Sequence, residues 1–245
     1  MKKSKENFTL LITGCIFPTK NVFCNTLKNP EERKKQYIES IRFYLEKTEV
    51  KNVVFCENSG VQDDSHLSEI ASKFGKNFEW LTFIGNQEKI AEHGKGYGEL
   101  EIVDYAVKNS KLLSKCNTFI KVTGRLKLVN IDKTRQYLDK NKNYFALSHR
   151  CFDVRSYLVT KDFYVNYLSK CKDLISDSNG YYLEHAFYDI AKKYKNDCSV
   201  FSFYLNFIGI SGSTGIKYRE KRGVNMALAN IKEFFKWLRW TFLNC

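Results

Sequence analysis

The amino-acid sequence predicts an α/β fold in which a mixed, mostly parallel sheet is flanked by helices. Apolar runs of strand length alternate with amphipathic segments of helix length along most of the 245 residues. Each expected strand ends in small or polar residues, and only two prolines and 13 glycines leave little room for long linkers. We therefore expect one packed domain over residues 1–222, followed by an amphipathic tail helix over residues 223–245.

The first half of the chain begins with a strand and a helix whose limits are clear in the sequence. An apolar run leads towards a helix with Pro30 near its start and acidic residues in its first turn. The inner face of this helix is marked at helical spacing by Tyr37, Ile41, Tyr44 and Leu45. In chain order, the sequence predicts a strand at residues 10–16, a helix at 31–46, a strand at 53–56, a helix at 67–74 and a strand at 79–84.

The second half continues the alternation and ends in a long, mostly apolar run. Residues 182–194 have the spacing of an amphipathic helix, and residues 199–210 have the composition of a buried strand. In chain order, the sequence predicts a helix at 100–115, a strand at 118–122, a helix at 131–138, strands at 144–148 and 155–159, helices at 163–168 and 182–194, and a strand at 199–210.

The chain is strongly basic, with 40 lysine and arginine residues against 27 acidic residues and a formal charge of +13. Such a balance favours anionic partners, of which nucleic acid, anionic lipid and nucleotide diphosphates all qualify. The lysines are scattered over presumed helix surfaces, and the sequence contains no recognisable nucleic-acid module. We therefore expect no nucleic-acid partner.

The cysteines and the N-terminus indicate a cytoplasmic protein. Eight cysteines lie far apart without a CxxC pair, which predicts free buried thiols in a reducing compartment and argues against a zinc site. The basic N-terminus leads into an apolar run of strand length only. We therefore expect neither a secretory signal nor a spanning helix at this end.

Polar residues follow several of the expected strands, at the edge where ligands of open α/β sheets collect. Glu57 and Asn58 follow one strand, and Thr123, Gly124 and Arg125 follow another. Each set alone is equally well explained as an ordinary polar turn. Because several such sets share one edge, we expect them to form a ligand site.

A glycine-rich segment from Gly94 to Gly98 precedes an expected helix. Flexible backbone amides at a helix start bind phosphate oxygens, and Lys95 supplies a countercharge between these glycines, with Gly96 and Glu99 following it. The segment matches neither the GxxxxGK[ST] phosphate loop nor the GxGxxG dinucleotide fingerprint, which argues against ATP hydrolysis and NAD chemistry. The alternative is a simple turn.

A second cluster of small and hydroxyl residues follows the last expected strand. Ser211, Ser213 and Thr214 offer hydroxyl groups, and Lys217 and Tyr218 come directly after them. Amides, hydroxyls and a cation in one loop suit a diphosphate leaving group, because they stabilise the negative charge that develops as it departs. The alternative is a plain surface turn.

Two residues near the start of the helix at 182–194 are candidates for acid–base chemistry. The Glu184 carboxylate or the His185 imidazole could deprotonate an acceptor hydroxyl, and Glu184 is the better candidate. Either residue could instead be an exposed first-turn residue, which is favourable for glutamate at a helix N-terminus. No serine or cysteine has a nucleophile-elbow pattern, so hydrolase chemistry has no support.

With these residues in place, the chain resembles the nucleotide-sugar glycosyltransferases of the GT-A type, and more narrowly bacterial capsule and O-antigen transferases. The resemblance covers residues 8–220 and is strongest from 94 to 128, where a glycine-rich basic segment, a helix and a strand ending in a polar triplet follow one another. In that class the triplet position holds a metal-binding DxD motif, whereas this chain has Thr123, Gly124 and Arg125. Arg125 can bind phosphate directly, so we expect metal-independent transfer and no certain cofactor, with a divalent metal still possible.

The resemblance implies an enzyme that moves a sugar, from a UDP-sugar as first choice, to a hydroxyl of a glycan or lipid-linked glycan, with inversion if Glu184 is the base. It places Thr13, Gly14 and Glu57 beside the nucleotide. It places Lys95 and Arg125 at the diphosphate, Glu184 at the acceptor hydroxyl, and Asp153 and Arg155 elsewhere in the pocket. Taken with the clusters above, the candidate donor-binding residues are Thr13, Gly14, Glu57, Asn58, Lys95, Gly96, Glu99, Thr123, Gly124, Arg125, Asp153, Arg155, Ser211, Ser213, Thr214, Lys217 and Tyr218.

The expected tail helix has the composition of an interfacial helix on anionic lipid. It bears Lys232, Lys236 and Arg239 beside one broad apolar region that comprises Met226, Ile231, Phe234, Phe235, Trp237, Leu238, Trp240 and Phe242. It is too short and too charged to span a bilayer, so we expect a peripheral protein on the inner face of the cell membrane. The alternative is an amphipathic helix packed on the domain.

Two other functions stay open at this point. One is a non-catalytic protein that binds the membrane surface through its basic tail. The other is a nucleotidyltransferase, for which the sequence lacks the clustered carboxylates that hold metal ions.

Overall fold

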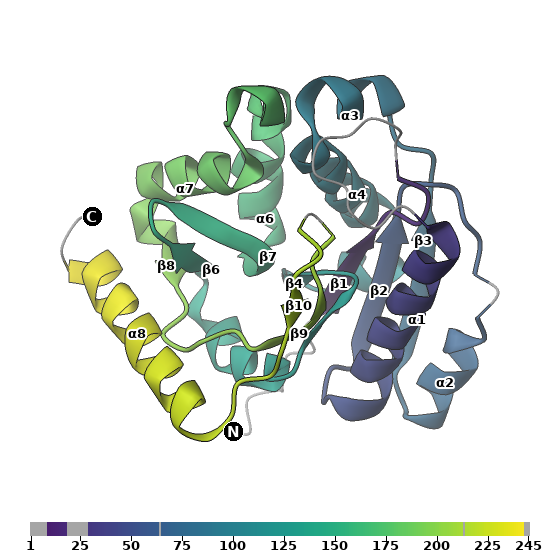
Figure 1. Cartoon of the computed structure of the whole chain (residues 1–245), viewed down its shortest axis with the longest axis horizontal. Coiled ribbons are helices and arrows are strands. Elements are labelled where there is room, and N and C mark those ends of the chain that lie inside the picture. The colour runs from purple at the N-terminus through teal and green to yellow at the C-terminus, as the bar shows by residue number, and fades with distance from the viewer. Residues whose placement is uncertain (1–8, 19–28, 64, 213, 243–245) are drawn as a thin grey trace.

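The structure is a computed structural model that describes residues 9–18, 29–63, 65–212 and 214–242. Seven strands of this described part form the central sheet: β1 (Thr9–Gly14), β2 (Asn52–Glu57), β3 (Asn77–Thr82), β4 (Thr118–Thr123), β6 (Asn143–Ser148), β7 (Cys151–Thr160) and β8 (Cys198–Val200). Their order is β3-β2-β1-β4-β7-β6-β8 (Figure 1). β3, β2, β1 and β4 are parallel, whereas β7 is antiparallel to both of its neighbours. The predicted mixed, mostly parallel sheet flanked by helices is confirmed.

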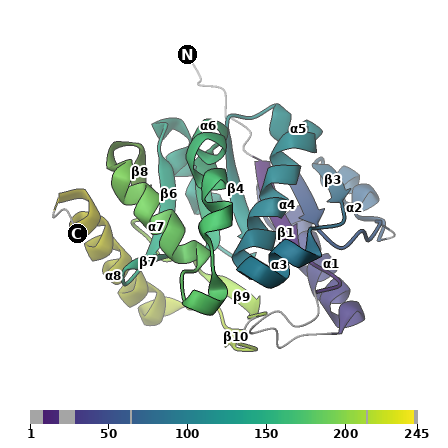
Figure 2. The same cartoon turned by 90° about the horizontal axis from the view of Figure 1, so that it is seen from above.

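Helices cover both faces of the sheet. The α-helices are α1 (Pro30–Lys47), α2 (Leu67–Lys73), α3 (Gln87–His93), α4 (Lys95–Asn109), α5 (Lys111–Ser114), α6 (Lys161–Phe163), α7 (Leu183–Lys193) and α8 (Gly223–Phe242). Short 3-10 or π turns are η1 (Ile131–Lys140), η2 (Tyr164–Leu168), η3 (Ser169–Leu174), η4 (Asp177–Asn179) and η5 (Lys195–Asp197). Seen from above, α4, α6 and α7 lie on one face of the sheet (Figure 2). α1 and α2 pack on the other.

The period-2 alternation of the strands divides the core into two layers. Leu10 and Ile12 of β1 face the layer that holds α1 and α2, and Leu11 between them faces the layer that holds α4 and α7. β2 alternates in the same way. Strands buried on both faces read as continuous apolar runs, which is why β1, β2 and β4 could be placed from sequence.

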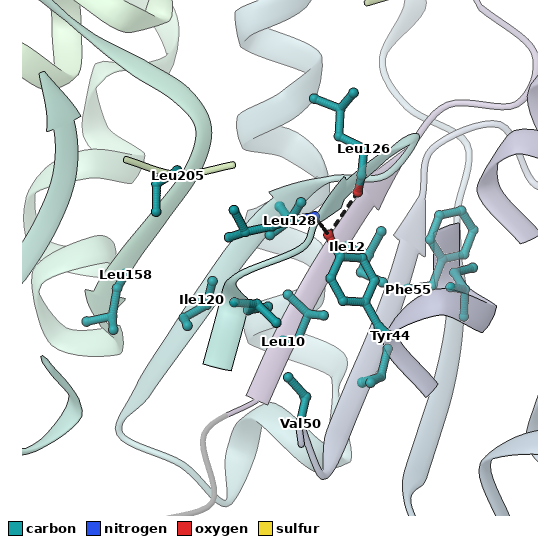
Figure 3. Close-up of a cluster of buried hydrophobic side chains, with 14 of the residues drawn as sticks. Leu10, Ile12, Tyr44, Val50, Phe55, Ile120, Leu126, Leu128, Leu158 and Leu205 are labelled. Carbon is teal, nitrogen blue, oxygen red and sulfur yellow. Dashed lines mark hydrogen bonds between the residues drawn. The ribbon is translucent and has the colours of Figure 1, made fainter. Parts of the chain in front are cut away.

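Helix α1 begins where the sequence predicts, because the Asn29 side chain accepts a hydrogen bond from the backbone N–H of Glu32 (3.1 Å) and Pro30 fills the first turn. Its inward Tyr44 ties the helix to the chain beyond β4. The Tyr44 hydroxyl accepts from the backbone N–H of Leu128 (2.7 Å) and donates to the carbonyl of Leu126 (2.8 Å), within an otherwise apolar cluster (Figure 3).

A second, smaller sheet lies beside the carboxyl end of β4. It contains β5 (Leu126–Leu128), β9 (Phe207–Ile210) and β10 (Lys217–Tyr218) in the order β10-β9-β5, with antiparallel pairing. Leu126, Leu128 and Phe207 join the α1 side of the core. This small sheet therefore fixes the polypeptide directly after residue 125, as β4 does before it, and brings residues 207–210 to the end of β4.

The structure corrects two expected elements. The segment from Gly94 to Gly98 is not a loop, because α4 already begins at Lys95 and a helix that the sequence did not predict, α3, ends at His93. The single strand expected at residues 199–210 is broken: β8 belongs to the large sheet and β9 to the small one.

Helix α8 packs on the domain through one face only. Trp240 is buried against Phe152 and Tyr188, and its indole N–H donates to the carbonyl of Cys198 (3.4 Å). The apolar residues expected to form one region of this helix therefore lie on two sides of it. Trp240 and Trp237 face the domain, whereas Ile231, Phe235 and Phe242 are exposed. No helix in the described residues is long and apolar enough to cross a bilayer.

Candidate active site

A cavity of about 790 Å³ lies at the carboxyl ends of β1 and β4, bordered by the starts of α4 and α7 and by the β9–β10 connection. Its size is that of a pocket for one cofactor-sized ligand. Most residues that the sequence predicts for the site lie on its wall: Thr13, Gly14, Asn58, Lys95, Gly96, Glu99, Thr123, Arg125, Asp153, Arg155, Glu184, His185, Ser211 and Tyr218.

Four predicted residues lie outside the cavity wall: Glu57, Gly124, Thr214 and Lys217. Glu57 is fully buried, and its carboxylate accepts from the backbone N–H groups of Ser59 (2.9 Å) and Val61 (2.8 Å) and from the hydroxyls of Ser59 and Thr82. It therefore closes the turn after β2 instead of facing a ligand. Ser213 lies outside the described residues.

Gly124 has a packing reason of its own. Its backbone N–H donates to the carbonyl of Thr13 (2.9 Å), and a Cβ at residue 124 would overlap that carbonyl and the Tyr37 ring. Glycine therefore lets β4 turn towards β5 close to the end of β1, which sets the starting point for the next residue, Arg125.

Arg125 forms one edge of the cavity together with Arg33 of α1. The Arg125 side chain is buried, with 8% exposure of the residue, yet its Nε and Nη1 groups have no hydrogen-bond partner among the described residues. Burial lowers the pKa of Arg125. Arg33 is 5% exposed, donates from Nε to the carbonyl of Cys15 (2.7 Å) and approaches the Tyr37 hydroxyl with Nη2 (3.4 Å). Two buried guanidinium groups thus border the cavity at the ends of β1 and β4.

The aromatic ring and the loop beside Arg125 restrict where its guanidinium can lie. The guanidinium carbon is 5.8 Å from the centre of the Tyr37 ring. A Cβ at residue 212 would overlap Arg125 Nη2, so Gly212 of the small-residue cluster packs directly on the guanidinium. This cluster therefore meets the diphosphate candidate Arg125, although Thr214 and Lys217 do not reach the cavity.

Glu99 of α4 and Lys121 of β4 form a largely buried ion pair. Lys121 has a fully buried side chain and also donates to the Val154 carbonyl (2.9 Å) and the Thr123 hydroxyl (3.2 Å). The Glu99 carboxylate accepts from the Thr13 hydroxyl as well (3.2 Å). The pair joins α4, β1 and β4 at the floor of the cavity, and it neutralises one carboxylate.

Asp153 and Arg155 of β7 form a second internal pair. The Arg155 guanidinium makes a two-pronged contact with the Asp153 carboxylate and lies 4.6 Å from the ring centres of both Phe207 and Tyr218. Planar guanidinium groups favour this stacking between aromatic rings. The arginine therefore holds β7 against the small sheet while Asp153 stays on the cavity wall.

Glu184 and His185 lie at the first turn of α7 and have different surroundings. Burial raises the pKa of Glu184 above the usual glutamate range, and the nearby charge of Glu99 raises it further. The Nδ1 atom of His185 accepts from the backbone N–H of Tyr182 (3.2 Å) and so caps the helix. Glu184 is thus the better placed of the two for proton transfer, because the ring nitrogen of His185 that faces the backbone is already engaged.

Close packing explains the glycines at the start of α4. Gly94 has a φ of 99°, and a Cβ there would overlap Asp177, whose Oδ2 accepts from the backbone N–H of Lys95 (2.9 Å). A Cβ at Gly96 would lie 3.0 Å from Cβ of Leu183, so this glycine lets α4 approach α7 closely. The backbone N–H of Lys95, an amide expected to bind phosphate, therefore donates to the Asp177 carboxylate of the same chain instead.

Sequence reasoning missed three residues that shape the site: Arg33, Lys121 and Asp177. Arg33 precedes Tyr37 by one helical turn, so helical spacing placed it on the inner face of α1. A lysine within the apolar run of β4 was also a signal, because a charge buried in a central strand needs a partner. Asp177 begins the short 3-10 helix η4, 82 positions from Lys95, and no local pattern marks it.

The strand order, with its parallel half and the antiparallel β7, and the cavity at the carboxyl ends of β1 and β4 define a GT-A or nucleotidyltransferase-like fold. The chain is similar to the Mn/GDP form of core-mannan synthase A from Aspergillus fumigatus, with 10% identity, coverage of 95% of this chain and 85% of that one, and a TM-score of 0.50. It is also similar to the WbbM bifunctional glycosyltransferase (9% identity, TM-score 0.49, 95% of this chain) and spans 44% of that protein.

A third similar structure is a protein assigned as a nucleotide-diphospho-sugar transferase from Desulfovibrio desulfuricans G20, with 8% identity, coverage of 80% and 79%, and a TM-score of 0.44. The sequence matches no protein family and no curated protein. At such identities the likeness shows the fold alone. Activity has to be argued from the side chains of the cavity.

Proposed function

We propose that the protein is a glycosyltransferase that moves a sugar from a nucleotide-sugar donor to a hydroxyl group of a glycan. The observation that carries the proposal is the Arg125 guanidinium, buried at the cavity with two N–H-bearing nitrogens that no described residue engages. A buried cation without an anion is costly, and an anionic ligand relieves that cost. The diphosphate of a nucleotide sugar is such an anion, and a guanidinium matches its oxygens in geometry.

The ends of β1 and β2 suit the nucleoside part of the donor. Asn58 is 4% exposed and lies on the cavity wall, and its Oδ1 atom accepts no hydrogen bond from the described residues. A buried acceptor without a donor is costly, and we propose that a ribose hydroxyl or an N–H group of the base supplies the donor when the ligand binds. Thr13 and Gly14 border the same end of the cavity. We propose a UDP-sugar as the donor.

Glu184 supplies the base in this scheme. The acceptor oxygen forms a bond to the anomeric carbon while the bond from that carbon to the phosphate oxygen breaks, and the acceptor proton passes to Glu184. The electron pair of the broken bond leaves on the diphosphate, beside Arg125. Attack from the side opposite to the leaving group inverts the anomeric centre, and a base whose pKa is raised towards neutrality suits this proton transfer.

Donor binding and turnover test the proposal separately. A thermal-shift screen against UDP, GDP, CDP and CMP identifies the nucleotide, and its release from the matching nucleotide sugars measures turnover. We expect Glu184→Gln to retain nucleotide binding and to lose turnover by roughly 100-fold or more, as general-base removal does. Arg135→Ala is the matched control, because Arg135 pairs with Glu49 away from the cavity. A protein that no nucleotide stabilises would not be a nucleotide-sugar enzyme.

We also propose that α8 holds the enzyme on an anionic membrane surface at the cytoplasmic side, where lipid-linked precursors of capsule or O-antigen polysaccharide would be its acceptors. The side of α8 that faces away from Trp240 carries an apolar stripe at helical spacing, with exposures between 52% and 75%: Val224, Leu228, Ile231, Phe235 and Phe242. Lys232 and Arg239 flank the stripe, and the whole chain carries a formal charge of +13, which is complementary to anionic lipid.

Vesicle flotation tests the membrane proposal without disturbing the core. We expect the wild-type protein to float with vesicles that contain phosphatidylglycerol and less with pure phosphatidylcholine. The double variant Ile231→Ser and Phe235→Ser should lose flotation and keep nucleotide binding. Leu174→Ser is the control, because Leu174 is 67% exposed on η3 and outside α8. Equal flotation of both variants would contradict the assignment of the stripe to lipid.

A further inference from the structure

We propose that Arg33 and Arg125 hold the donor diphosphate directly, so that this protein binds nucleoside diphosphates without a divalent metal ion. The inference rests on the donor function proposed above and names how the site recognises its ligand. A solved protein of similar fold is described in an Mn/GDP form, so the question is whether the residues of this chain fit such an ion.

The residues at the carboxyl end of β4 do not fit a divalent cation. Hard cations take several oxygen ligands, of which carboxylates are the strongest. Thr123, Gly124 and Arg125 offer one hydroxyl and a positive charge. A cation placed beside Arg125 would be repelled by it and by Arg33 on the same edge of the cavity.

The carboxylates on the cavity wall are engaged elsewhere. Glu99 pairs with Lys121, Asp153 pairs with Arg155, and Asp177 accepts from the backbone N–H of Lys95. The fourth, Glu184, has a pKa raised by burial, so its surroundings disfavour the charged form that a metal ion requires. No group of three or more His, Cys, Asp or Glu side chains in the described ranges has the arrangement of a metal site.

The two arginines supply instead what a diphosphate needs. The Tyr37 hydroxyl lies next to Arg33 (3.4 Å from Nη2), and the Tyr37 ring lies beside the Arg125 guanidinium, so one side chain positions both cations. Cys15 lies on the same wall, where its carbonyl accepts from Arg33 Nε. Burial raises the pKa of its thiol to about 11, so the thiol stays neutral and leaves the positive charge of the pair intact. Two adjacent guanidinium groups can bridge the oxygens of two linked phosphates.

Gly212 makes this arrangement testable without removing a charge. A Cβ at residue 212 would overlap Arg125 Nη2, so Gly212→Ala has to displace the guanidinium from its place on the cavity wall. The substitution is on an irregular segment between β9 and β10, away from the core layers. It therefore perturbs the geometry of the anion site more than the fold.

Isothermal titration of the full chain with UDP, GDP and CDP, first in EDTA and then with Mn²⁺, tests the inference. We expect the best nucleotide to bind with dissociation constants that agree within about twofold in the two conditions. Arg125→Ala and Arg33→Ala should each weaken binding by roughly 10- to 100-fold, as the loss of a charge-assisted contact does. Arg125→Lys should fall between, and Gly212→Ala should weaken binding with the same urea midpoint as wild type. Arg135→Ala, on η1, should bind as wild type does.

The outcomes separate the two proposals. Binding that disappears in EDTA and returns with Mn²⁺ would overturn the metal-free site and leave the glycosyltransferase proposal standing. Wild-type affinity in a folded Arg125→Ala protein would also overturn the metal-free site. If no nucleoside diphosphate binds in either condition, the proposed donor function itself is wrong, and the inference fails with it.

Discussion

Replacing Tyr44 by phenylalanine tests how α1 holds the chain beyond β4 in place. Tyr44 is fully buried, and its hydroxyl joins two backbone groups on either side of Lys127: it accepts from the N–H of Leu128 and donates to the carbonyl of Leu126 (Figure 3). The variant removes one oxygen and leaves the ring in place, so packing changes little. What it removes is the acceptor of a buried backbone N–H.

The size of the stability loss depends on which of the two backbone groups still has a hydrogen-bond partner in the variant. The Leu126 carbonyl still accepts from the Ser40 hydroxyl (3.0 Å), whereas the N–H of Leu128 loses its acceptor. A buried donor left unsatisfied costs about 1–3 kcal/mol, so we expect Tyr44→Phe to lower the free energy of unfolding by that amount. In a chain of this size each kcal/mol lowers Tm by roughly 2–4 °C.

Urea denaturation and calorimetry of Tyr44→Phe, Ser40→Ala and the wild type measure the effect. Ser40→Ala removes one of two donors to a carbonyl that keeps the other, so we expect a smaller loss of about 0.5–1 kcal/mol. Because Leu126 follows Arg125 directly, UDP affinity should also weaken in the Tyr44 variant. The reasoning is refuted if Tyr44→Phe unfolds at the wild-type urea concentration, or if Ser40→Ala costs as much.

Three further changes probe the α4–α7 contact, the proposed base and the tail. Gly96→Val overfills the contact with Leu183, and urea denaturation should show a loss of about 1–3 kcal/mol. Burial raises the pKa of Glu184, so the stability that its protonated form contributes should be present at low pH and should be lost as pH rises from the usual glutamate range through the raised pKa. The Glu184→Gln protein should lack this decline. In the wild type, the acid limb of the kcat/KM profile should lie above the usual glutamate range. Trp240→Ala should cost about 3–5 kcal/mol in calorimetry, whereas Phe235→Ala, on the exposed stripe, should change stability by less than about 0.5 kcal/mol.

The elements that sequence reasoning placed well are those whose pattern is set locally. Helix α1 has its cap at Asn29, Pro30 in its first turn and an inward face at helical spacing, all within one segment. Residues 199–210 misled for the opposite reason. Their alternating aromatic residues do face one core layer, but the backbone N–H groups of Tyr204 and Asn206 are taken by the side chains of Asn230 (3.0 Å) and Asn130 (2.9 Å) instead of by a neighbouring strand. Only tertiary structure supplies such acceptors.

The candidate site divides in the same way. Residues that follow strands, such as Thr123 and Arg125, could be assigned to the cavity because the carboxyl ends of parallel strands meet at one edge. Whether each side chain is free for a ligand depended on distant partners. The Asp177 carboxylate accepts a hydrogen bond from the backbone N–H of Lys95, 82 positions away. The Glu57 carboxylate accepts hydrogen bonds from the Thr82 hydroxyl and from the backbone N–H of Ser59 in the turn after β2. Composition and spacing contain no information about these pairings.

If the proposed function is right, the positions of Arg125 and Glu184 determine the orientation of the nucleotide-sugar donor in the cavity. The pKa of Arg125 is shifted by its own burial, by Tyr37 and by Arg33, whereas the pKa of Glu184 is shifted by its burial, by a backbone hydrogen bond and by the charges of Glu99, Lys121 and Asp153. The edge with Arg33 and Arg125, at α1 and the ends of β1 and β4, is therefore distinct from the edge with the proposed base, at the first turn of α7. A diphosphate is drawn to the first edge, so the anomeric carbon attached to it points towards the second, where a base is needed. A donor bound in the reverse sense would move its phosphates away from this edge and leave the buried Arg125 guanidinium without an anion, which disfavours that orientation.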